Sequence, residues 1–413
     1  MASVFGLFKR NYQLFSPPTV PKTDGALRFG ILGAANIAPM ALIIPAKSHA
    51  EVIVAAVAAR DPVKANAYAK KHGIPIVHKT YDDLINDPSI DCIYNPLPNG
   101  LHYVWTIKAL KAGKHVLLEK PSVSNSEEAQ SLFRHPLLSQ PNAPVLLEAF
   151  HYTFHPAWRL FLTLFDSKDV QHVEVNNFLP FTMFPLNDIR FNYSLSGGTL
   201  MDFGSYAVSS VRGIYDAEPS VVTSASYRAM PPGYDTKIDH GVKASYEFPN
   251  GGTADIAADH KTSWATLRKA LAPNLLVTMK PKETQIAAGR KEVEKKVIHF
   301  TNYMGPQMYH KILVTVNTET LDAQGKVVKI EHSKKVEKAY SWAEKSEDMK
   351  GEDYWATYRY QLEAFVNRVK GRKGSGVWVD GEDSIKQMEL IDRTYEKLGL
   401  PARPTSEVLQ TAA

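Results

Sequence analysis

Between Leu27 and Phe150, the hydrophobic and polar positions follow two patterns that alternate along the chain. Short apolar runs, such as LRFGIL at 27–32 and HVLL at 115–118, predict buried strands, and stretches with helical spacing of apolar residues follow them. Strand and helix in regular succession are typical of βαβ units, whose parallel strands are covered by helices on both faces. Residues 25–150 are therefore expected to form an α/β domain around a parallel sheet.

After about residue 150 the helical stretches between strands disappear. Apolar runs such as VQHVEVNNFLP and KILVTVNT follow one another through turns, and the PNGG sequence at Pro249 is typical of a hairpin. Residues 151–354 are thus expected to form an α+β domain with a large, mostly antiparallel sheet. Residues 355–413 return to helical spacing, which predicts two helices that pack back on the core.

Composition narrows the classes of protein that this chain could represent. No apolar run approaches the ~20 residues that span a bilayer, so an integral membrane protein is not expected. The single cysteine, Cys92, lies in an apolar strand, which indicates a buried thiol and a reducing compartment. The net charge of +5 is mild and the lysines are mixed with glutamates, which disfavours nucleic-acid binding. A cytoplasmic protein is therefore expected.

The first 24 residues stand apart from this pattern. They carry Lys9, Arg10 and Lys22 and no acidic residue before Asp24. A mitochondrial presequence would have this charge balance, but so few basic residues favour an extension that packs on the protein surface. Residues 1–24 are interpreted as such an extension.

A glycine-containing turn follows the first strand, in the sequence GILGAANIA. Gly33, Ala35 and Ala38 occupy the three small-residue positions of a dinucleotide-binding fingerprint. Small side chains there let the backbone approach a pyrophosphate, and the amides that begin the next helix can bind it. The loop residues Ala34, Asn36 and Ile37 are expected to contact the same cofactor.

The second strand ends in AARDP, where the adenosine ribose of a dinucleotide would lie. An acidic residue at this position binds the ribose 2′-hydroxyl, whereas arginine suits a 2′-phosphate. Asp61 before Pro62 has the sequence of a helix N-cap. Ala59 and Arg60 are therefore assigned to the cofactor, which is predicted to be NADP, with NAD as the alternative.

Two further predicted strands end at the same crevice. Ligands bind at the carboxyl ends of parallel strands, so the residues that follow these strands are candidates for the site. NPLPNGLH offers Leu97, Pro98, Asn99 and His102, and LLEKP offers Glu119 and Lys120. A lysine beside a nicotinamide can stabilise negative charge that develops on a reacting oxygen. Pro121 would fix its direction, and a cis peptide bond is accessible there.

The sequence GGTLMDFGSYAVSSVRGIYD predicts a helix with a second functional face. Asp202 and Tyr206 lie four residues apart, outside the apolar stripe, so they point the same way. A carboxylate and a phenol so placed can hold a substrate hydroxyl and pass on its proton. His151 and His155 share the same spacing, but Pro156 and the lack of a third ligand argue against a metal site. The segment through Tyr152 is expected near the nicotinamide.

Together these motifs closely resemble the glucose-fructose oxidoreductase/inositol dehydrogenase family from about residue 27 to 403. The most specific element is AGKHVLLEKP followed by the Asp-x-x-x-Tyr pair. Within the family, the chain is similar to dimeric dihydrodiol dehydrogenase and NADP-dependent D-xylose dehydrogenase. The extension before residue 25 and the longer lysine-rich stretch from 280 to 345 depart from the family pattern.

The resemblance implies a Rossmann domain and a second domain whose open sheet forms a homodimer. It also implies that Lys120, Asp202 and Tyr206 are catalytic, and that Tyr152 and Arg190 join Asp202 and Tyr206 around the substrate. The resulting hypothesis is metal-free, NADP-dependent oxidation of a sugar or polyol. Oxidation of trans-dihydrodiols and a non-catalytic NADP(H)-binding regulator remain as alternatives.

Overall fold

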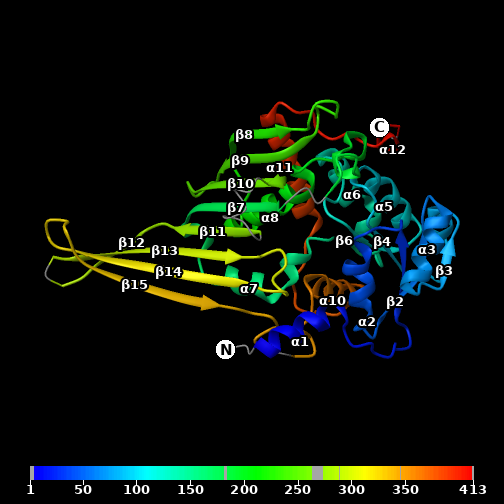
Figure 1. Cartoon of the computed structure of the whole chain (residues 1–413), viewed down its shortest axis with the longest axis horizontal. Helices are drawn as coiled ribbons and strands as arrows, with labels where there is room; N and C mark the ends of the chain where they lie inside the picture. The colour runs from blue at the N-terminus through cyan, green and yellow to red at the C-terminus, as the bar shows by residue number, and fades with distance from the viewer. Residues whose placement is uncertain (1–3, 181–183, 263–272, 288, 345, 412–413) are drawn as a thin grey trace.

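The chain folds around two β-sheets, which lie side by side in a computed structural model that describes residues 4–180, 184–262, 273–287, 289–344 and 346–411 (Figure 1). The first sheet is parallel, and the second is mixed and mostly antiparallel. Both features confirm the expected fold class. None of the helices within these ranges is long and apolar enough to cross a membrane.

The first sheet has the strand order β3-β2-β1-β4-β5-β6, and every pair in it is parallel. Its strands are β1 (Leu27–Leu32), β2 (Val52–Ala58), β3 (Ile76–His78), β4 (Cys92–Asn95), β5 (His115–Leu118) and β6 (Leu146–Glu148). The short strands β3 and β6 were not predicted. Strands β1, β4 and β5 lie in the middle, so their carboxyl ends form one continuous edge.

The helices of this half are α2 (Ile44–Lys47), α3 (Pro62–His72), α4 (Tyr81–Ile85), α5 (His102–Lys111) and α6 (Ser126–Phe133). Asp61 caps α3, because its side chain accepts hydrogen bonds from the amides of Val63 and Lys64. Pro45 lies in the first turn of α2, where the amide that proline lacks is not needed, and the π-helical turn η1 (Pro39–Ile43) precedes it.

The second sheet has the order β15-β14-β13-β11-β7-β10-β9-β8, with β12 paired to β13. Its strands are β7 (Val170–Pro180), β8 (Val221–Ala229), β9 (Asp239–Glu247), β10 (Thr253–Thr262), β11 (Asn274–Met279), β12 (Lys282–Gln285), β13 (Lys291–Thr301), β14 (Lys311–Leu321) and β15 (Val327–Glu337). The PNGG turn joins β9 and β10 as an antiparallel pair, as predicted. Strands β7 and β10 are parallel to each other.

Helices cover the second sheet on one side. Helices α8 (Ser205–Tyr215) and α11 (Gly381–Leu398) pack against β7, β8 and β10, and α7 (Pro156–Leu162) lies nearby (Figure 1). α10 (Thr357–Val369) returns to the first half and contacts α2 and η1. The short α12 (Glu407–Gln410) ends the described chain. The helix α8 thus lies between the second sheet and the crevice of the first.

The N-terminal segment forms helix α1 (Val4–Phe15), which packs on the second half of the molecule. Arg10 donates hydrogen bonds to the carbonyls of Gln307 and Met308, and its guanidinium lies 3.6 Å from the ring centre of Tyr340. A buried arginine with these partners anchors the helix, so the segment is an ordered part of the surface.

Candidate active site

A cleft of about 420 Å³ lies between the carboxyl edge of the first sheet and the start of α8. The first half of the chain supplies the ends of β4 and β5 to its wall, and the second half supplies the turn before α8. Its polar and aromatic lining includes Asn99, His102, Glu119, Lys120, His151, Arg190, Asp202, Tyr206 and Tyr358. Of the three residues predicted to be catalytic, all lie in this cleft.

Lys120 enters the cleft directly after β5. Its Nζ donates to Asp202 Oδ1 at 2.8 Å and to the Asp202 carbonyl at 3.0 Å, and it lies 4.5 Å from the ring centre of Tyr206. The peptide bond to Pro121 is cis. The ammonium group is therefore fixed between two residues that come from more than eighty positions further along the chain.

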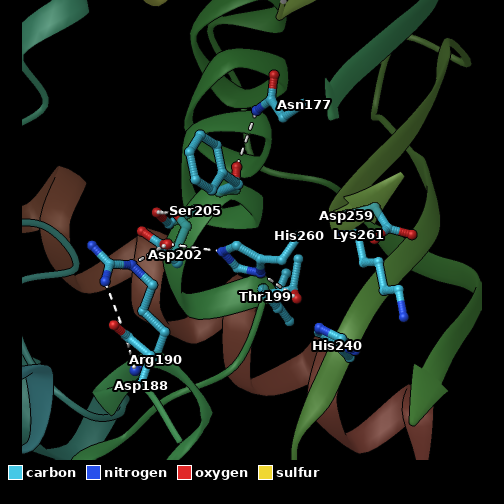
Figure 2. A network of polar contacts seen from close by, with 12 residues as sticks. Asn177, Asp188, Arg190, Thr199, Asp202, Ser205, His240, Asp259, His260 and Lys261 are labelled. Atoms are coloured by element: carbon cyan, nitrogen blue, oxygen red, sulfur yellow. Dashed lines mark hydrogen bonds and ion pairs between the residues drawn. The ribbon is translucent and has the colours of Figure 1, made fainter. Parts of the chain in front are cut away.

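The carboxylate of Asp202 is the electrostatic centre of the cleft (Figure 2). Besides Lys120, it accepts hydrogen bonds at Oδ2 from Arg190 Nε at 3.1 Å and from His260 Nε2 at 2.9 Å. Burial alone would raise the pKa of Asp202, but Lys120, His260 and Arg190 hold it well below its usual value. These partners favour the ionised form of Asp202, whose carboxylate holds the Lys120 ammonium in place.

A wide helical turn places Asp202 at the cleft. Residues Leu200–Gly204 form the π-helical turn η8, in which the Gly204 amide donates to the Thr199 carbonyl five residues earlier at 2.8 Å. A Cβ on Gly204 would come within 3.1 Å of that carbonyl, which explains the glycine. The predicted helix is correct, but its first turn is wider than the α-helical spacing that paired Asp202 with Tyr206.

Tyr206 forms a neutral pair with His151. Its hydroxyl lies 2.8 Å from His151 Nε2, and the His151 ring centre is 4.0 Å from that of Tyr358. Burial raises the pKa of Tyr206 well above 10, and burial and then Lys120 lower the pKa of His151 to about 3. The Lys120 ammonium, 4.5 Å from the Tyr206 ring centre, does not reverse the upward shift of the Tyr206 pKa.

The first strand ends in a turn that fits a dinucleotide. Gly33 has φ +87, its amide donates to the Ala58 carbonyl at 2.7 Å, and a Cβ there would meet Leu97 at 3.1 Å. Ala34, Ala35 and Ile37 are half-buried, Asn36 is exposed and Ala38 is fully buried. The small side chains of this turn let a pyrophosphate come close to the backbone amides. Arg60, which is exposed after β2, lies at the same edge of the sheet.

Other predicted residues hold the walls of the cleft. His102 is buried, with its ring nitrogens 2.8 Å and 2.7 Å from the carbonyls of Pro121 and Leu97, and burial lowers its pKa to about 4. The amide group of Asn99 donates to the Ser196 carbonyl at 3.0 Å. Glu119 accepts a 2.7 Å hydrogen bond from Tyr94, and burial raises its pKa.

Tyr152 does not line the cleft as predicted, and three residues at or beside the cleft were not among the predicted site residues. Tyr152 lies at a separate hollow with its hydroxyl 2.9 Å from Ser209 Oγ, whereas its neighbour His151 lines the cleft. From the sequence, His151 was expected near the nicotinamide as part of the segment through Tyr152, but no role was assigned to it, and Tyr358 and His260 were not among the predicted site residues. His260 comes from β10, and nothing in the local pattern of that strand marks it. Within the described ranges, no group of three or more His, Cys, Asp or Glu could hold a metal ion.

Comparison with known proteins identifies the family. Residues 27–136 match a model of the GFO_IDH_MocA oxidoreductase family with its NAD-binding Rossmann fold, and residues 169–270 match the GFO/IDH/MocA C-terminal domain. A D-xylose 1-dehydrogenase (NADP(+)) of Haloferax volcanii is 36% identical over 371 residues, which cover 90% of this chain and 97% of that protein. The chain belongs to the GFO/IDH/MocA oxidoreductase family.

More distant relatives agree with this assignment. A trans-1,2-dihydrobenzene-1,2-diol dehydrogenase of Xenopus laevis is 31% identical over 209 residues, which cover 50% of this chain and 59% of that protein. Among solved structures, an aldose-aldose oxidoreductase of Caulobacter crescentus has a TM-score of 0.65 at 21% identity and covers 90% of this chain and 97% of its own. That structural likeness supports the fold. The family membership makes the chain an oxidoreductase with an NAD-binding Rossmann domain.

Proposed function

We propose that this oxidoreductase oxidises a CH–OH group of a sugar or polyol with NADP⁺. The observation that carries the proposal is the Lys120 ammonium, held at 2.8 Å by the ionised Asp202 at the end of β5. A fixed positive charge at this edge can stabilise the oxygen of a reacting alcohol. The 36% identical relative, which spans almost the same length, is named as an NADP(+)-dependent D-xylose dehydrogenase.

Each residue of the cleft has a role in this proposal. NADP⁺ held at the end of the first strand would supply the acceptor for the hydride that leaves the substrate carbon. Lys120 binds the substrate oxygen and, by its charge, favours loss of the hydroxyl proton. Tyr206 is placed to relay that proton, because its hydroxyl can take up the substrate proton as it passes its own to His151 Nε2. Asp202 keeps Lys120 in position. Arg190 and Asn99 supply donors for further hydroxyl groups of a sugar.

The choice of NADP over NAD depends on Arg60 in this proposal. Arg60 is exposed after β2, and Asp61, which could bind a ribose hydroxyl, is used to cap α3. Arg60→Ala should weaken NADP⁺ binding by ~1.5–3 kcal/mol, the range for a charge-assisted hydrogen bond, and leave NAD⁺ binding nearly unchanged. Titration of both cofactors by fluorescence measures this, and equal affinity in the wild type would exclude the NADP assignment.

A trans-dihydrodiol is the second candidate substrate. Phe184 and Phe203 line the cleft and give it an apolar side that could receive a carbon ring. The relative from Xenopus laevis carries that activity in its name. The two candidates differ in polarity, so an assay separates them directly.

A homodimer in the cytoplasm completes the proposal. Ser226, Lys243, Ser245 and Asp255 line a shallow hollow on the second sheet, which offers polar side chains to a second copy. Light scattering at micromolar concentration measures the assembly, and a monomer would contradict it.

The deciding experiment is a substrate screen with the purified full-length chain. Aldoses, polyols and trans-dihydrodiols are each incubated with NADP⁺ while absorbance at the NADPH band is followed. Turnover of an aldose or polyol that Lys120→Ala abolishes would support the proposal. Turnover of dihydrodiols alone would favour the second candidate, and no turnover of any alcohol despite NADP⁺ binding would favour a regulator.

A further inference from the structure

The strands β13, β14 and β15 extend as an arm beyond the rest of the second sheet, away from the Rossmann domain (Figure 1). β15 is the edge strand of that sheet, and every residue from Val327 to Val336 is exposed. Its exposed apolar side chains include Val328, Ile330 and Val336, each about half exposed. An edge of this length with apolar side chains is a template for another strand.

Backbone geometry limits how β15 could pair with its own copy. Along the edge of a sheet only every second residue directs its amide and carbonyl outward, so an antiparallel copy must align outward-facing residues with one another. In a symmetric pair, one residue of the strand therefore lies directly opposite the same residue of the second copy, and the two-fold axis passes at that position. Only a few registers are therefore possible.

Charge selects one of these registers. With the axis through Ser333, Lys329 lies opposite Glu337 and Glu331 lies opposite Lys335, while Ile330 lies opposite Val336. By symmetry each of these pairs occurs twice, so every opposed acid faces a base.

The neighbouring registers place like charges opposite each other. An axis through His332 sets Lys329 against Lys335, and an axis through Lys334 sets Glu331 against Glu337. Like charges directly opposite one another destabilise a strand pair. The register through Ser333 is therefore favoured over both.

The existing fold supports the same register. The regular pairing of β15 with β14 runs from Lys329 to Glu337, and a bulge interrupts it between Lys329 and Val327. Ser333 is the midpoint of this regular segment, so an axis there would use all of it.

The two faces of β15 carry different kinds of side chain: one is charged and the other is partly apolar. Lys329 lies 2.8 Å from Glu331 and Lys335 lies 2.5 Å from Glu337, both on one face. Ile330 and Val336 lie on the other face. Lysines on an edge strand normally repel a second strand. In this register, however, the pair Lys329–Glu331 of one copy lies opposite the pair Glu337–Lys335 of the other, so each cluster contains four charges of alternating sign.

We propose that β15 pairs antiparallel with β15 of a second copy of this chain, with the two-fold axis at Ser333. The contact joins the two large sheets into one continuous sheet and buries the apolar side chains of both edges. It is separate from the hollow over β7–β10, so one chain can make both contacts. The active-site cleft lies outside the contact and keeps its activity without it.

Cysteine cross-linking tests the register. Cys92, the only native cysteine, is fully buried, so Ser333→Cys adds one reactive thiol. Under mild oxidation of the full chain, Ser333→Cys should form a disulfide-linked dimer, because opposed residues have Cα atoms within the range a disulfide spans. Lys335→Cys alone should not cross-link, but mixed with Glu331→Cys it should.

Charge reversal tests the interface without a cross-link. Glu331→Lys and Lys335→Glu should each halve the particle mass measured by light scattering, because each variant opposes like charges twice. The combined swap, Glu331→Lys with Lys335→Glu, should restore the wild-type mass. Lys243→Glu, on β9, is the control that leaves the β15 contact intact and its Ser333→Cys cross-link unchanged.

Three results would overturn the proposal. The first is a wild-type mass of one chain at micromolar concentration. The second is a mass that neither single charge reversal changes. The third is equal cross-linking of Ser333→Cys and Lys335→Cys, which would indicate random collision. Circular dichroism of each variant verifies that the fold is retained, since β15 is exposed and its substitutions disturb no core contact.

Discussion

Both sides of the active-site cleft are largely removed from solvent, but they are electrostatically opposite. On one side Lys120, Arg190 and His260 surround Asp202, whose pKa lies well below its usual value. On the other side Tyr206 and His151 form a hydrogen-bonded pair in which both groups stay neutral. Burial alone therefore does not decide the charge of a group.

The number of donors around each group makes the difference. Asp202 receives donors from three side chains that offset the cost of burying its charge, whereas a Tyr206 phenolate would have no such set, and aromatic rings such as Phe150 surround it. The charged side therefore holds the Lys120 ammonium in place, and the neutral pair of Tyr206 and His151 can pass on a proton. A dehydrogenase needs both functions within one cleft.

The largest effect is expected from removing the cation of the charged side. Lys120→Ala should lower kcat by ~10³-fold, because a positioned charge at the reacting oxygen is lost. Cofactor binding, measured by fluorescence titration, should change little. The matched control is Lys108→Ala, which breaks an exposed ion pair with Asp82 at 2.9 Å and should leave turnover unchanged. Near-wild-type turnover of Lys120→Ala would refute its catalytic role.

A smaller loss is expected from the neutral side. Tyr206→Phe removes the hydroxyl that contacts His151 and should lower kcat by ~10²-fold. The double variant with Lys120→Ala should be little slower than the slower single variant, because groups that act as a unit are not additive. Steady-state kinetics with one accepted substrate measures all three. Fully additive losses would mean that the two sides act independently.

His151 should matter less for rate than Tyr206 does. His151→Phe keeps an aromatic ring against Tyr358 but removes the nitrogen that lies 2.8 Å from the Tyr206 hydroxyl. The phenol then loses its fixed direction, and kcat should fall by ~10-fold with KM nearly unchanged. His151→Asn, which keeps a polar atom, should recover part of that loss. An unchanged kcat in His151→Phe would exclude a positioning role.

The smallest effect concerns stability against pH. The folded pKa of His151 is about 3, below its usual value of 6.5, so between these limits the unfolded chain binds more protons. Stability should therefore fall as pH falls through this window, and His151 contributes on the order of 2 kcal/mol of that loss at pH 5. Urea unfolding at pH 7.5 and 5 measures it. The difference should be smaller in His151→Phe, and an equal difference would contradict the neutral state of His151.

The fold class and the elements that carry the candidate site residues could be predicted from local sequence patterns. The GILGAANIA turn, the lysine after a core strand and the Asp202–Tyr206 spacing are local patterns, and local patterns follow from strand and helix geometry. The Asp61 cap and the hairpin at Pro249 were predictable for the same reason. Local sequence did not reveal the wide turn η8, because a π-helical turn depends on how its residues pack against their neighbours.

The contacts between residues from distant parts of the chain could not be predicted in this way, because they depend on how the elements pack. His260 reaches Asp202 from β10, and His151 reaches Tyr206 from the crossing between the two halves, separations of 58 and 55 residues. The protonation states follow from those meetings, since a pKa reflects the groups brought around a side chain by folding. The sequence places Lys120, Asp202 and Tyr206 on their elements. The packing of the two sheets makes one side of the cleft charged and the other neutral.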